Sequence, residues 1–298
     1  MQSLSRGWSF LQEAWRMAFK DKDLIKPSIY SLFAGLVVSI IGIIPIIAVV
    51  ILFSDSQIGN IIIFALSAIL IFVNYIVSYI FSAMTVYLIF GYLSEGDGRM
   101  DKAWAVVQRD FFDIAALAAA STAVNLLTSQ LRGGRNRRGG NLIGGMLAGL
   151  IDTVWTEAAF LLLPVMTIED VSIGNALKRV GQITKNNLLL IGVSTVGVKW
   201  VTGLIGFALA VIGAVIGFAV GGGLVFALGS STIVYVIGLA LGLLIFFAFA
   251  MAASVINTYT STAYHTCLYL WAREAEKAQA AGQPMRVAAP APLAAVLG

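Results

Sequence analysis

Charged residues are scarce in this sequence, and so are the residue types that build metal centres and disulfides. Only 11% of the 298 residues are Asp, Glu, Lys or Arg, whereas about a quarter is typical of a soluble domain. His265 and Cys267 are the only histidine and cysteine. An internal disulfide is therefore excluded, and we expect no metal site and no cofactor.

Apolar sequence takes the place of charge: 59% of the residues are hydrophobic and the mean hydropathy is +0.91. A bilayer core about 30 Å thick needs about 20 apolar residues in a helix. The uncharged runs are much longer than the about 10 residues of a barrel strand and do not alternate, so helices are favoured over a closed barrel. We expect an all-α polytopic protein of the cell membrane with spans at about 28–53, 58–92, 112–131, 142–166, 187–219 and 231–271.

The second and sixth apolar segments are too long for a single crossing. No charged residue occurs in 58–93 or in 203–272, and the C-terminal half of each segment is rich in Ser, Thr and Asn. We expect both helices to extend beyond the bilayer and to pack against protein or lie among the headgroups, with a broken sixth helix as the alternative. The turn between the last two spans is expected within 221–231, where glycines and serines gather.

A short polar stretch followed by two apolar segments occurs three times. The stretches begin at Ala14-Trp15-Arg16, at Ala103-Trp104 and at Ala176-Leu177-Lys178-Arg179. Each predicts an amphipathic interfacial helix that leads into a transmembrane hairpin. Three such units could surround a pseudo-threefold axis, which occurs in transporters but also arises by duplication of a packing unit. The expected repeats are about 4–94, 98–168 and 171–272, in one membrane domain 1–276 followed by an Ala/Pro-rich cytoplasmic tail 277–298. We expect this tail to be irregular and extended, with docking back on the cytoplasmic ends of the long helices as a further possibility.

Aromatic and basic residues of these stretches are candidate membrane anchors. In an interfacial helix, Trp and Phe occupy one face and Lys and Arg another. By one interpretation the three helices only fix the depth of the hairpins. By the other they form a surface for a cytoplasmic protein or for anionic lipid. The predicted anchors are Trp8, Trp15, Arg16, Trp104, Arg109, Lys178 and Arg179.

Most of the 19 lysines and arginines fall on the side of the membrane that holds the N-terminus. Because these residues mark cytoplasmic loops, both termini are expected in the cytoplasm. One glycine-rich loop departs from the rule, since it places four arginines on the opposite side. Such a loop can contact anionic headgroups or an acidic partner but is more often solvated, and no nucleic-acid partner is expected. Its arginines are Arg132, Arg135, Arg137 and Arg138.

Three charged residues fall within the predicted spans: Asp152 and Glu157 in the fourth, and Lys199 in the fifth. A helical rise of 1.5 Å per residue places Glu157 about 15 Å and Lys199 about 18 Å from the same end of the bilayer, so these two can pair. Asp152 lies further along and has no evident partner. The charges therefore form either an ion pair that sets helix register or a site coupled to protons or ions.

Other motifs point to packing and not to catalysis. No serine lies in a nucleophile signature, and the triple glycine at 221–223 lacks the lysine of a phosphate-binding loop, so an enzyme is not expected. Gly-xxx-Gly pairs predict close helix contacts, either within the bundle or in a homodimer. These pairs are Gly145/Gly149, Gly213/Gly217 and Gly238/Gly242.

The segment Phe160–Asp170, followed by Ala176–Arg179, resembles a motif of certain uncharacterised prokaryotic integral membrane proteins. There a span ends in an apolar-Pro-apolar stretch, an acidic residue follows, and a basic helix leads into the next span. The opening Gly7-Trp8 and the run Lys20–Leu24 are similar to the start of the same family. The chain is more loosely similar to the membrane domain that accompanies some glycerophosphodiester phosphodiesterases. The resemblance implies a six-helix fold, and the activity of the soluble domain does not carry over.

Two functions are compatible with these patterns. The first is a non-catalytic integral membrane scaffold or accessory subunit that binds a membrane protein, a lipid or another copy of itself through its interfacial helices. The second is a small transporter or channel for an ion, metabolite or lipid that uses the intramembrane charges. We favour the scaffold, because no span shows the Gly/Pro-interrupted pairs that mark many transport sites.

Overall fold

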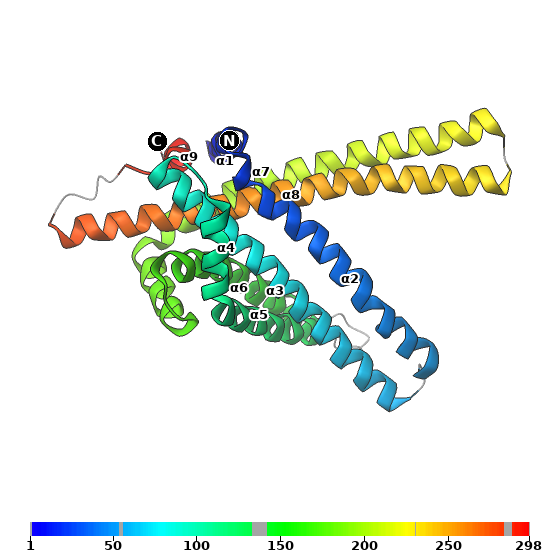
Figure 1. Ribbon diagram of the computed structural model, residues 1–298, viewed down its shortest axis with the longest axis horizontal. Coiled ribbons are helices and arrows are strands. Elements are labelled where there is room, and N and C mark those ends of the chain that lie inside the picture. The colour runs from blue at the N-terminus through cyan, green and yellow to red at the C-terminus, as the bar shows by residue number, and fades with distance from the viewer. Residues whose placement is uncertain (1, 54–55, 133–141, 230, 283–287, 298) are drawn as a thin grey trace.

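The computed structural model describes residues 2–53, 56–132, 142–229, 231–282 and 288–297 (Figure 1). This part of the chain contains helices and no strand. In chain order the elements are α1 Gln2–Lys20, the 3₁₀ helix η1 Lys22–Leu24, α2 Lys26–Phe53, α3 Gln57–Glu95, α4 Met100–Arg109, α5 Phe111–Arg132, α6 Leu142–Glu169, α7 Ile173–Leu228, α8 Thr232–Ala280 and α9 Ala291–Leu297.

Six helices are long and apolar enough to cross a membrane, which confirms the predicted all-α polytopic fold. They form three hairpins, α2–α3, α5–α6 and α7–α8, each made of helices that are consecutive in the chain and contact each other. Both α3, with 39 residues, and α8, with 49, are continuous, so the sixth span is not broken. The chain therefore has the organisation of a multi-pass membrane protein.

The core lies where the hairpins come together at one end. There α3, α6 and α8 each contact the other two. Their meeting segments, 82–89, 159–167 and 259–269, are largely buried, whereas the exposed large apolar side chains of α3 and α8 lie within 58–69 and 233–247. Two of these segments are the polar C-terminal halves that we expected to pack against protein. Such a threefold meeting is what three repeats would produce, although the repeat itself stays a prediction.

The three polar stretches enter this core in the same register. The alanine that opens each stretch is fully buried, and the residue four positions later, one helical turn on, is buried as well. One face of each stretch therefore packs on the bundle. The buried pairs are Ala14 with Ala18, Ala103 with Val107, and Ala176 with Val180.

Two aspartates accept hydrogen bonds from backbone amides far along the chain. The Asp21 carboxylate accepts a hydrogen bond of 2.8 Å from the backbone N–H of Gly98, just before α4. Asp113 accepts one of 3.0 Å from the backbone N–H of Ile173, at the first residue of α7. A Cβ at position 98 would lie 2.8 Å from the Asp21 carboxylate oxygen, so a side chain there would displace that carboxylate. The bond to Ile173 satisfies one of the amide groups that the start of α7 leaves unpaired.

The α7–α8 hairpin is held by glycines facing glycines. A Cβ at Gly217 would lie 2.5 Å from the backbone oxygen of Gly242, and one at Gly221 would lie 2.5 Å from that of Gly238. Here the glycine pairs serve packing within the bundle. Our prediction of a turn at the triple glycine was wrong at its start, because residues 221–223 lie inside α7, and the helix ends only at Gly229, with φ +87°.

Two further expectations need correction. The third stretch is not a separate helix, because it forms the start of α7, a single helix of 56 residues. The stretch is followed neither by an aspartate like the one after α1 nor by a proline like the one at the start of α2. The tail is not wholly irregular either, since α9 forms after Pro290, whose carbonyl accepts the amide of Leu293 at 2.8 Å. Leu293 is fully buried, and α9 packs on α1 and α8, so both ends of the described chain lie at the same end of the bundle (Figure 1).

Candidate functional site

A charged cluster joins α6, α7 and α8. Glu157, on α6, forms an ion pair with Lys199 on α7, as the depth argument predicted. Its other carboxylate oxygen lies 3.0 Å from Nε2 of His265 on α8. The histidine side chain is 3% exposed and the lysine side chain 42% exposed. The cluster therefore reaches from the core to the surface of the bundle.

The histidine contacts require a proton between His265 and Glu157. Nδ1 of His265 lies 2.7 Å from the carbonyl oxygen of Ser261, which can only accept, so Nδ1 carries a hydrogen. Nε2 then faces a carboxylate, which also accepts unless it is protonated. One hydrogen between Nε2 and the Glu157 carboxyl group therefore completes the contact.

Aromatic rings fix the imidazole in place. Phe160 stacks on His265 with ring centroids 4.9 Å apart and an interplanar angle of 13°, and Tyr264 meets it edge-on at 5.2 Å. Nearby, the Trp155 indole N–H donates to the Ser121 hydroxyl at 2.9 Å. The ring contacts position the imidazole between α6 and α8, and the Trp155 bond joins α6 to α5 nearby.

Asp152 does not join this cluster, and it is not the unpartnered acid that we expected. Its carboxylate pairs with Arg132 at 2.9 Å, and both side chains are about half exposed. The pair connects the last residue of α5 to α6. Arg132 was predicted as part of a cationic loop. The other three arginines of that loop, Arg135, Arg137 and Arg138, lie outside the described residues.

Further ion pairs bind the helix ends at the core. Arg109 contacts Asp110 at 2.7 Å and Asp170 at 3.1 Å. Arg179 contacts Glu169 at 3.4 Å and Glu276 at 2.5 Å. Burial of the Arg179 guanidinium lowers its pKa, but hydrogen bonding and attraction by the two glutamates outweigh this and raise the pKa overall.

The predicted anchors thus divide into two groups. Trp15 belongs to the core, since its indole N–H donates to Thr260 at 3.2 Å and its ring packs edge-on against Tyr259. With Arg109 and Arg179, it holds helices together. The other four predicted anchors are exposed: Trp8, Arg16, Trp104 and Lys178.

His265 is the residue of the cluster that sequence reasoning missed as a partner of Glu157. The two lie 108 positions apart, so no local spacing relates them. The usable signal was a lone histidine at the polar end of an apolar span, where a buried imidazole needs a partner. Within the part of the chain that the structure describes, no three His, Cys, Asp or Glu residues come together as metal ligands would.

Comparison of the chain with models of protein families gives no match, and comparison with curated protein sequences gives none either.

Proposed function

We propose that this protein is a non-catalytic membrane scaffold or accessory subunit that holds a membrane-protein or lipid partner against the surface formed by α1 and α4. The observation that carries this proposal is the pairing of the intramembrane charges. Glu157 is engaged by Lys199 and His265, and Asp152 by Arg132. The contacts of Glu157 join three helices and those of Asp152 join two, which is the role of structural ion pairs.

An exposed aromatic and basic surface supports the same proposal. Trp8 and Trp104 are each 48% exposed, and Phe19 is 73% exposed. Arg16 lies on the same helix as Trp8 and is exposed as well. The bond between Asp21 and Gly98 brings the end of α1 next to the start of α4, so both helices belong to one end of the bundle. Such a surface suits headgroups or the loops of a neighbouring membrane protein.

The hairpins add long apolar walls. The most apolar stretches of α2 and α3 have no buried residue, and in α8 only 6% of such a stretch is buried. The α2–α3 and α7–α8 hairpins diverge from each other beyond the core (Figure 1). Lipid or the spans of another protein must cover these walls, which gives a scaffold a wide contact area within the bilayer.

The test is purification of the protein in native nanodiscs, followed by mass spectrometry of what remains bound. We expect a stoichiometric companion whose retention falls when Trp8 and Trp104 are both changed to serine. Phe226→Ser serves as the matched control, because Phe226 is 94% exposed at the far tip of the α7–α8 hairpin. That control variant should retain the companion.

The opposite result is also measurable. If the protein purifies alone and moves an ion or metabolite across liposome membranes, the scaffold proposal fails. Transport through the cluster would be lost in the double variant Glu157→Gln, Lys199→Met while the protein stays folded. The scaffold proposal instead expects this double variant to keep its companion, because two neutral side chains can replace an ion pair.

A further inference from the structure

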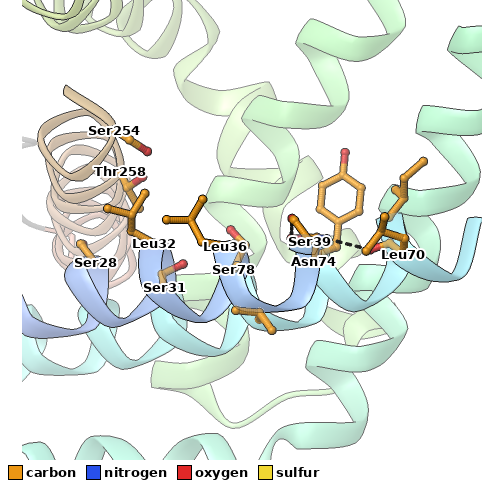
Figure 2. A pocket seen from close by; sticks show the side chains of 14 residues that line it. Ser28, Ser31, Leu32, Leu36, Ser39, Leu70, Asn74, Ser78, Ser254 and Thr258 are labelled. Atoms are coloured by element: carbon orange, nitrogen blue, oxygen red, sulfur yellow. Dashed lines mark hydrogen bonds between the residues drawn. The ribbon is translucent and has the colours of Figure 1, made fainter. Parts of the chain in front are cut away.

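A groove lined by hydroxyl groups lies between α2, α3 and α8, and it shares no lining residue with the charged cluster. Its volume is about 620 Å³, within the range of small-molecule sites. Eight of its fourteen lining residues carry a hydroxyl or amide, and none is charged. Figure 2 shows Ser28, Ser31 and Ser39 on α2, with Ser254 and Thr258 across from Ser28 and its neighbour Leu32.

At the end of the groove that contains Ser39 and Asn74, the polar groups hydrogen-bond within the protein. The Ser39 hydroxyl donates to the side-chain oxygen of Asn74 at 3.3 Å, and the Asn74 amide donates to the Leu70 carbonyl at 2.9 Å. A Cβ at Gly35 would lie 3.7 Å from the same Asn74 oxygen, so α2 and α3 are in close contact here. No polar group at this end requires a ligand.

The end of the groove that contains Ser28 does require a ligand. Ser28 is 3% exposed, lines the groove, and its hydroxyl has no hydrogen-bond partner among the described residues. A helical serine usually donates to the carbonyl four residues earlier, but for Ser28 that residue is Leu24, which belongs to η1 and precedes α2. A buried hydroxyl without a partner is unfavourable, so this one is best explained by a group that binds it.

The groove has an exposed apolar wall between its two polar ends. Leu36, between the two polar ends, is 41% exposed, and Leu70 lines the same wall. Ser28 lies two residues from the basic Lys26 at the start of α2, and Ser39 lies about 16 Å further along the helix. The unsatisfied end is therefore the one nearest the headgroups, and the apolar wall leads from it toward the bilayer interior.

We propose that this groove binds an uncharged glycerolipid of the diacylglycerol class. The free hydroxyl and ester carbonyls of such a lipid would bond to Ser28, Ser31 and Thr258, while an acyl chain follows Leu36 and Leu70. Because no lysine or arginine lines the groove, it offers nothing to neutralise a phosphate. The inference is independent of the scaffold proposal, since it concerns a different surface.

The test uses a diacylglycerol carrying a photoreactive acyl chain, added to the whole protein in phosphatidylcholine nanodiscs. We expect saturable labelling that maps to peptides of α2, α3 or α8 and is displaced by unlabelled diacylglycerol. Phosphatidic acid should displace it less well. Ser28→Ala removes one hydrogen bond and should weaken competition about five-fold, the ratio that about 1 kcal/mol gives.

Two variants make the result specific. Ser31→Leu fills the groove and should abolish saturable labelling, whereas Ser129→Ala should not change it, because the Ser129 hydroxyl bonds to its own helix at the Leu126 carbonyl. The competition between diacylglycerol and phosphatidic acid is measured on the unaltered protein, so it tests the proposal even if a variant fails to fold. Labelling that does not saturate, that maps outside the groove, or that phosphatidic acid displaces better would overturn the proposal. So would a partner protein's helix cross-linked in the groove in place of the lipid.

Discussion

Replacing Glu157 by methionine tests whether the buried cluster holds α6, α7 and α8 together. Methionine has a similar length but cannot accept a hydrogen bond from His265 or pair with Lys199. The imidazole is 3% exposed, so the loss of its partner should cost about 1–3 kcal/mol. Lys199 is 42% exposed, and solvent screening limits the loss of its ion pair to about 1 kcal/mol or less.

The sum is a loss of about 1–4 kcal/mol in the free energy of unfolding. The assay is the midpoint of thermal unfolding in nanodiscs, followed by size-exclusion chromatography of the heated protein. On the scale of about 2–4 °C per kcal/mol, the midpoint should fall by about 2–16 °C. Asp152→Asn is the control, because its half-exposed pair with Arg132 is worth less than about 1 kcal/mol.

A second substitution separates the histidine bond from a general packing defect. In the double variant Glu157→Met, His265→Phe, both partners become apolar, so the unsatisfied imidazole is gone and most of the stability should return. Glu157→Gln should cost less than half as much as Glu157→Met, since the amide can still bond to a neutral imidazole. If the double variant is no more stable than the sum of the single changes predicts, the bond between His265 and Glu157 is not the stabilising contact.

Three further predictions concern packing. Gly221→Val should separate the helices of the α7–α8 hairpin and lower the unfolding midpoint, because the new Cβ would meet the Gly238 backbone. Gly222→Ala is the control and should leave the midpoint unchanged, because a Cβ at Gly222 would have no neighbouring atom within 4 Å. Leu293→Ser should release α9 from the bundle, because it removes about 2–4 kcal/mol from the free energy of docking this helix. The release should appear as faster proteolysis near residue 282, and equal digestion rates of the variant and the unaltered protein would contradict the docking. Trp15→Phe should cost about 1 kcal/mol by loss of one hydrogen bond, whereas a purely interfacial tryptophan would change membrane association and not the unfolding midpoint.

The six helices were predictable because a bilayer imposes a single strong requirement, a long and mainly apolar run with few charges, and each run is visible in the sequence. The pairing of Glu157 with Lys199 was predictable for a related reason, since depth in a straight helix follows from residue number alone. The direction in which a side chain points around the helix axis does not follow from residue number. Whether Asp152 points to Lys199 or to Arg132, and whether His265 reaches Glu157, depends on how three helices are rotated against each other.

Helix ends were harder to predict than helices. The triple glycine at 221–223 is typical of a turn when considered alone, but it is helical, and its first residue, Gly221, packs against Gly238 on the next span. Likewise the sequence contains Pro290 and Pro292 in a tail that looks irregular, but a buried position for Leu293 favours a short helix there. In both places a contact distant in the chain overrides the local preference of the residues.

The bonds from Asp21 to Gly98 and from Asp113 to Ile173 have a consequence for the order of assembly. Each aspartate belongs to one unit, and the amide that it binds enters the bundle with the next. During synthesis, a hairpin inserted into the membrane therefore presents an aspartate that stays hydrated until the following unit arrives. Each arriving unit would dock at a defined position on its predecessor, so insertion and packing could proceed together in the direction of the chain.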